Sequence, residues 1–216
     1  LMKPYGYEPG KKYPMVIYIH GGPHSAYGEG WFDEFQNLAA QGMFVLFTNP
    51  RGSSGYGADF TYSTRGRWGM EDYEDLMKAV DIVAARPDVD STKMGATGGS
   101  YGGYATAWCS TKFSARFAAG VMFVGISDKV SKVGTTDIPD EEYYVHARKR
   151  PWEDWQFLLE RSPIYHTANA RTPLLILHGK DDPRVNVGQS RELHRHLKLR
   201  GQAPVRAVLR LDDSAS

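Results

Sequence analysis

The sequence predicts an α/β fold, a mostly parallel sheet with helices on both faces. Apolar runs of strand length alternate along the chain with segments of helical periodicity, the pattern of a parallel sheet whose crossover connections are helices. Turn residues, mostly glycine and proline, bound these segments. At 216 residues, 41% of them hydrophobic, the chain can bury a sizeable core, so we assign residues 1–216 to a single domain.

Each strand is expected where a short apolar run is bounded by turn residues, as in strands buried on both faces. Such runs occupy residues 15–19, 43–48, 117–124, 172–177 and 204–211. A further strand should lead into Gly98. Helical spacing of apolar residues predicts helices over 31–41, 71–86 and 187–200, and a helix-forming run follows Gly102.

Residues 127–163 depart from this alternation. They are irregular and rich in charged and aromatic side chains. A loop of this length inside a compact domain is usually a binding element or a lid. The basic run 146–150 lies near the acidic residues 140–142, and we interpret it as a solvated loop with internal ion pairs.

Composition excludes several functions. The net charge of +1 gives no sign of a nucleic-acid surface, and the apolar run 117–126 is too short to span a membrane. The glycine runs lack the order of a dinucleotide or phosphate loop, and no Cys/His cluster has metal-ligand spacing, so we expect neither cofactor nor metal. The single cysteine, Cys109, should be packed in the core. Oligomeric state and compartment stay open.

The stretch Gly98-Gly99-Ser100-Tyr101-Gly102 matches G-x-S-x-G, a nucleophile at a sharp strand-to-helix turn. Glycine is needed at both ends because a Cβ there would collide with the neighbouring strand or helix. The first amide of the following helix points toward the serine and can stabilise a developing oxyanion. The motif alone is weak evidence, because this chain is rich in glycine and serine.

Two further stretches follow predicted strands, at the edge where open parallel sheets bind ligands. His20-Gly21-Gly22-Pro23 can supply a second oxyanion amide, and the alternative is a plain Gly-Pro turn. The stretch 178–185 carries Asp181 and Asp182 after the nucleophile in chain order, and the alternative is a solvated turn.

Five ordered motifs carry a resemblance to a known family: HGGPHSAYG, NPRGSSGYG, GGSYGGY, SPIYHTANARTPLLILHG and DDPRV. In this order the chain resembles the catalytic domain of the prolyl oligopeptidase family of serine peptidases, nearest to its acylaminoacyl-peptidase and dipeptidyl-peptidase-like branch. The resemblance implies an α/β-hydrolase fold and action on short peptides, with no nucleic-acid or membrane partner. It also implies a preceding β-propeller; neither that propeller nor the first strands of the hydrolase domain is expected in this chain.

The resemblance assigns roles to individual residues. Ser100 would be the nucleophile, and Asp182 rather than Asp181 the acid, because the family's pattern is an acid, one spacer and an arginine. The backbone amides of Tyr101 and Gly22 would form the oxyanion hole. The substrate-binding residues would be Arg184, which would hold a substrate carbonyl, and the aromatic residues Tyr143, Tyr144 and Trp152, which either line the pocket or only pack the loop.

One departure from the family concerns the general base. The family places a histidine just after the last strand, where this sequence has Ala215. His194 and His196 are poor substitutes, because their i, i+2 spacing points them to different sides of a helix. We therefore expect a peptidase impaired in this chain. A carboxylesterase with the same machinery and a non-catalytic binding module remain the alternatives.

Overall fold

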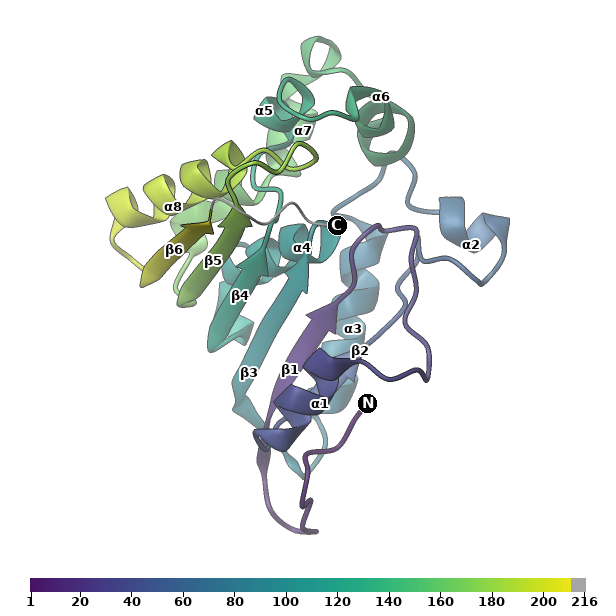
Figure 1. Cartoon of the computed structure of the whole chain (residues 1–216), viewed down its shortest axis with the longest axis vertical. Coiled ribbons are helices and arrows are strands. Elements are labelled where there is room, and N and C mark those ends of the chain that lie inside the picture. Colours follow the sequence, from purple (N-terminus) through teal and green to yellow (C-terminus); the bar gives the residue numbers. More distant parts are fainter. Residues whose placement is uncertain (211–216) are drawn as a thin grey trace.

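The computed structural model describes residues 1–210, whose centre is one six-stranded sheet in the order β2-β1-β3-β4-β5-β6 (Figure 1). Every pairing between these strands is parallel, which confirms the predicted fold class. The strands are β1 (Tyr13–Ile19), β2 (Phe44–Phe47), β3 (Val89–Gly99), β4 (Ala119–Phe123), β5 (Leu174–Gly179) and β6 (Val205–Arg210).

Helices cover both faces of the sheet, as predicted. Figure 1 shows α1 in front of the strands, with α3, α4 and α8 behind them. The helices are α1 (Asp33–Ala40), α2 (Ala58–Tyr62), α3 (Glu71–Ala84), α4 (Tyr101–Ser110) and α8 (Gly188–Arg200), with 3-10 turns η1 (Ser114–Arg116) and η4 (Pro163–Asn169). Of these, α2 was not predicted, and its five residues are too few for a periodic signal.

Alternation along β1 builds the two layers of the core. Met15, Ile17 and Ile19 belong to the main cluster, with side chains of α3 and α4. Val16 points to the other face and packs in a cluster with Phe35 of α1. Because side chains alternate with period two, one strand contributes to both layers.

Helix α4 lies wholly inside the protein, since all ten of its residues are buried. Small residues allow this close packing: a Cβ at Gly103 would lie 2.4 Å from the Phe123 carbonyl oxygen. The polar side chains of Thr106 and Ser110 bond back to carbonyl oxygens one turn earlier, at 2.8 and 2.9 Å. Cys109 is buried there as predicted, and burial raises the pKa of its thiol to about 12.

The stretch 127–163 is less irregular than expected. It forms short helical pieces above the carboxyl ends of the strands (Figure 1). These are α5 (Lys129–Val133), α6 (Pro139–Glu141), a π-helical turn η2 (Glu142–Ala147), a 3-10 turn η3 (Pro151–Glu153) and α7 (Trp155–Glu160). Each piece is too short to show helical periodicity in the sequence.

Candidate active site

Ser100 sits at a strained turn between β3 and α4, with φ 56° and ψ −117°. Its amide donates to the Phe123 carbonyl at 3.1 Å, and its own carbonyl accepts from the Tyr104 amide at 2.9 Å. A Cβ at Gly98 or Gly102 would lie 2.3 or 2.0 Å from the Ile19 carbonyl oxygen. The glycine spacing thus has the steric origin that the motif predicted.

The loop after β1 approaches this turn closely. A Cβ on Gly21 would lie 3.6 Å from the Ser100 Cβ, and Gly22 has φ +113°, a conformation that favours glycine. Among residues 1–210, none accepts a hydrogen bond from the amide of Gly22 or of Tyr101. Both amides therefore have a free donor, as an oxyanion hole requires.

His20 holds this loop in place. Its Nδ1 lies 2.7 Å from the Gly21 carbonyl oxygen, so Nδ1 carries the proton and donates it there. Its Nε2 then accepts from the Ser53 hydroxyl at 2.9 Å. Burial lowers the pKa of His20, in keeping with a neutral, structural imidazole.

Asp182 is buried, and its two oxygens have different surroundings. Oδ1 accepts the amides of Arg184 and Val185, each at 2.9 Å. Oδ2 is also buried, but no group within residues 1–210 donates a hydrogen bond to it. Asp181, in contrast, is exposed.

The nearest imidazole to Asp182 Oδ2 is already committed elsewhere. His178 Nε2 lies 3.9 Å from Oδ2 but donates to the Val185 carbonyl oxygen at 2.7 Å. Its Nδ1 accepts from the Ser190 hydroxyl at 2.6 Å. Burial lowers the pKa of His178. The residue is therefore structural.

A cavity of about 230 Å³ opens beside Ser100. The structure brings Gly22 and Arg184 to the same cavity as Ser100, together with Val185, whose amide holds Asp182. Its apolar walls are Trp68, Ile126, Ile138 and Val185, and its ionisable lining residues are Lys132, Glu141, His146 and Arg184.

Arg184 is paired at the edge of this cavity. Its Nε donates to Asp137 Oδ1 at 2.7 Å, and both side chains are exposed to solvent. The Asp137 carboxylate raises the pKa of Arg184, so its guanidinium stays charged.

The three predicted aromatic residues lie outside the described lining of this cavity. Tyr144 is 51% exposed and Trp152 is 70% exposed. The ring of Tyr143 lies 4.6 Å from the guanidinium of Arg150, a cation–π contact within the same segment. For Tyr143, this contact fits the alternative that the ring packs the loop.

The sequence did not predict a buried ionic cluster that borders this cavity. Glu142 lies between three cationic or ionisable side chains: Lys132 donates to its Oε1, Lys129 Nζ is 3.5 Å from its Oε2, and His146 Nδ1 is 2.8 Å from Oε1. All four side chains are at most 3% exposed. The interpretation of residues 140–142 and 146–150 as solvated is therefore wrong for Glu142 and His146.

Burial and charge interactions shift the pKa values of Glu142 and Lys129 in this cluster. Burial alone would raise the pKa of Glu142, but Lys129, His146 and Lys132 together hold it well below its usual value. Burial lowers the pKa of Lys129, against the effect of Glu142. The spacing of Lys129 and Lys132 (i, i+3) and of Glu142 and His146 (i, i+4) could have signalled that each pair shares a helix face.

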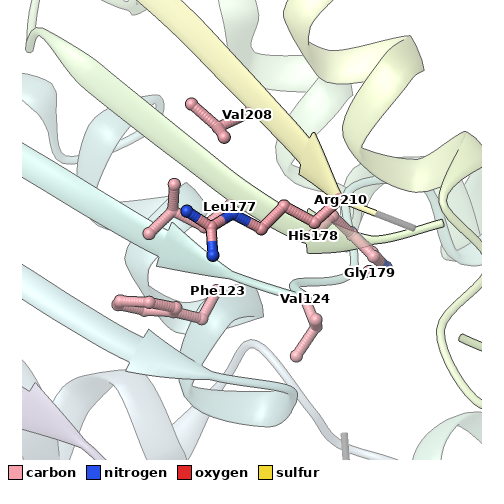
Figure 2. Close-up of a pocket in the computed structure, with 7 residues that line it drawn as sticks. All are labelled: Phe123, Val124, Leu177, His178, Gly179, Val208 and Arg210. Carbon is pink, nitrogen blue, oxygen red and sulfur yellow. The ribbon is translucent and has the colours of Figure 1, made fainter. Parts of the chain in front are cut away.

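A second hollow, of about 300 Å³, lies at the carboxyl ends of β4, β5 and β6. Figure 2 shows its lining, which includes Phe123, Leu177 and Arg210. Phe123 also accepts the Ser100 amide, so this hollow adjoins the nucleophile turn. The chain continues from Arg210 toward Ala215, the expected base position, which lies outside the described residues.

Within residues 1–210 there is no group of three or more His, Cys, Asp or Glu side chains that could hold a metal ion. None of the helices in that part of the chain is long and apolar enough to cross a membrane.

Most of the chain is similar to known peptidases. The model of the prolyl oligopeptidase family matches residues 30–213. The chain is 43% identical over 203 residues to "Uncharacterized peptidase YuxL" of Bacillus subtilis (strain 168), covering 94% of this chain and 31% of that protein. It is 34% identical over 202 residues to "Acylamino-acid-releasing enzyme" of Sus scrofa, covering 91% and 28%.

The acylaminoacyl peptidase structure from Pyrococcus horikoshii superposes with a TM-score of 0.92 at 31% identity, covering 98% of this chain and 34% of that one. The chain thus belongs to the prolyl oligopeptidase family of serine peptidases and has its α/β-hydrolase fold. It spans about a third of the length of these relatives.

Proposed function

We propose that this chain is the catalytic domain of a serine peptidase that cleaves short peptides, of the acylaminoacyl- or dipeptidyl-peptidase type. The observation that carries this proposal is the bare Oδ2 of Asp182, which is buried with no donor among residues 1–210. A buried carboxylate oxygen without a partner is costly, and an imidazole N–H would satisfy it. The amides that fix the other oxygen belong to Arg184 and Val185, which line the Ser100 cavity.

The proposed reaction forms an acyl-enzyme. Ser100 Oγ attacks the carbonyl carbon while the base imidazole takes its proton, and the amides of Gly22 and Tyr101 stabilise the resulting oxyanion. Each such donor contributes about 2.7 to 4 kcal/mol to transition-state stabilisation. The imidazolium then protonates the leaving amine, and water releases the acyl group by the same steps. Asp182 Oδ2 would orient the imidazole throughout.

The position that the family resemblance assigns to the base is Ala215 in this sequence. A serine hydroxyl is a weak nucleophile without a base, so we propose that Ser100 reacts slowly in a chain with alanine in that role. The test is labelling by a fluorophosphonate probe, with Ser100→Ala as the blank. Rapid labelling of Ser100 in the chain with Ala215 would contradict the impaired reactivity.

The substrate class is tested on a form whose tail after β6 supplies a histidine. Its rates on p-nitrophenyl acetate and on a blocked-peptide anilide are compared, with Ser100→Ala as the control. Cleavage of both supports the peptidase. Hydrolysis of the ester alone would favour the carboxylesterase, and inertness toward both would favour a binding module.

A further inference from the structure

The floor of the cavity beside Ser100 is formed by Lys132 and His146, whose hydrogen-bond donors are only partly satisfied. Lys132 is 1% exposed and lines the cavity. An ammonium carries three N–H donors. Among residues 1–210, Glu142 Oε1 is the one acceptor bonded to Lys132 Nζ. Two donors of a buried cation are thus left for the contents of the cavity.

His146 adds to this floor. It also lines the cavity and is 3% exposed. Its Nδ1 is 2.8 Å from Glu142 and its Nε2 is 3.5 Å from Glu141, but neither approach has hydrogen-bond geometry within residues 1–210. A ligand acceptor can therefore compete for the proton of this ring.

The surroundings hold this donor floor rigid. The ring of His146 stacks on Trp68 with centroids 3.6 Å apart, and Lys129 Nζ lies 4.6 Å from the centroid of Trp68. Lys129 and Lys132 share the single carboxylate of Glu142. Side chains fixed in this way need little ordering when a ligand binds.

We propose that this cavity takes the substrate side chain just before the scissile bond, and that it selects a side chain ending in a carboxylate or amide oxygen, as in glutamate and glutamine. Its apolar walls, among them Ile126, Ile138 and Val185, enclose the methylene groups, while Lys132 and His146 meet the terminal oxygen. An apolar side chain of the same length leaves the buried donors unsatisfied, which is the basis of strong discrimination. This assignment rests on the proposed function, because it places the scissile bond at Ser100.

Binding to the Ser100→Ala variant of this chain tests the side-chain selection without turnover. Isothermal titration compares the anilides of N-acetyl-glutamine, N-acetyl-glutamate and N-acetyl-norleucine, which match closely in length. We expect the first two to bind about tenfold or more tightly than norleucine, the value of a hydrogen bond to a charged group. Norleucine binding as tightly as both would overturn the proposal.

Substitution of Lys132 locates the effect. Lys132→Met should abolish the preference, whereas Lys78→Met, at an exposed position of α3, should preserve it. If Lys132→Met loses its near-UV circular dichroism, His146→Phe replaces it, because it removes the other donor of the floor while a phenyl ring can still stack on Trp68. An unchanged preference in the folded variant contradicts the assignment.

Reactivity of Ser100 separates this inference from the function on which it rests. In a form with a histidine after β6, fluorophosphonate labelling together with equal cleavage of the glutamine and norleucine anilides would refute the selection alone. Inert Ser100 together with Lys132-dependent binding of the glutamine anilide would refute the peptidase and leave only the selection of this cavity for a side-chain oxygen standing.

Discussion

The phenol of Tyr101 donates a 2.6 Å hydrogen bond to the carboxylate of Asp72, and both residues are fully buried. The same carboxylate accepts the amides of Gly69, Met70 and Tyr73, so it joins the beginning of α3 to the beginning of α4. The amide of Tyr101 is one of the two proposed oxyanion donors, with that of Gly22. This bond therefore anchors a residue whose backbone position would matter for the transition state.

Tyr101→Phe should lower the free energy of unfolding by about 1 to 3 kcal/mol, because Asp72 loses one of its four donors in a buried place. In a form with a histidine base after β6, kcat should fall by a larger factor than the factor by which KM changes. Urea denaturation and steady-state kinetics measure both effects. Tyr144→Phe, at an exposed ring, is the matched control. Equal stability of the two variants would contradict the anchoring role.

Gly98→Ala tests the steric origin of the nucleophile turn. Its Cβ would lie 2.3 Å from the Ile19 carbonyl oxygen, and backbone on both sides prevents relief. We expect a loss of about 3 kcal/mol in urea denaturation. Gly95→Ala, on the same strand, meets its nearest atom at 3.6 Å and should cost much less. A Gly98→Ala variant as stable as Gly95→Ala would count against this explanation.

Asp182→Asn tests the choice of acid. The asparagine oxygen can still accept the amides of Arg184 and Val185, so the fold should persist. In a form with a histidine base, kcat should fall by about 10⁴, because an amide cannot orient the imidazole as a carboxylate does. Asp181→Asn, at the exposed neighbour, should leave kcat nearly unchanged. The reverse order of effects would move the acid to Asp181.

Glu142→Gln tests the buried cluster through pH. The folded pKa of Glu142 is lowered, so its ionised form contributes stability above the unfolded pKa of about 4.3 and loses that contribution as pH falls through the folded pKa. At pH 7 the variant should be about 3 to 5 kcal/mol less stable, since Lys129 and Lys132 lose their counter-charge.

The stability difference between Glu142 and its glutamine variant should therefore shrink in acid. Urea midpoints at pH 7, 5, 4 and 3 measure this trend, with the exposed Glu29→Gln as the control. A difference that stays constant down to pH 3 would mean that Glu142 does not carry its charge in the cluster.

The nucleophile turn could be predicted from the sequence because its residues form one short motif, with Gly98 and Gly102 flanking Ser100 at fixed spacing. The atom that each glycine makes room for, the Ile19 carbonyl oxygen, belongs to β1 and is known only from the structure. The strands could also be predicted from the sequence, since a run such as 15–19 is apolar and bounded by turn residues. The order of Ser100 and Asp182 along the chain can also be read directly from the sequence, without a structure.

The cavity floor could not be predicted in the same way. Lys132 and Glu142 are ten residues apart, and their burial depends on how separate short pieces of 127–163 fold onto Trp68. Charged residues are almost never fully buried unless paired, so a local pattern favours solvent for each of them. Burial becomes favourable for these residues only because folding brings a partner of opposite charge next to each of them.

The enclosure of α4 leaves the helix behind the nucleophile little freedom to vary. Every side chain of that helix is surrounded, so nearly any substitution there disturbs packing around the nucleophile. The ionisable groups of the cavity floor belong instead to the stretch 127–163, inserted between β4 and β5. We therefore expect a change of selectivity to need substitutions in that insertion that keep its buried charges balanced, since Lys129 and Lys132 both depend on Glu142.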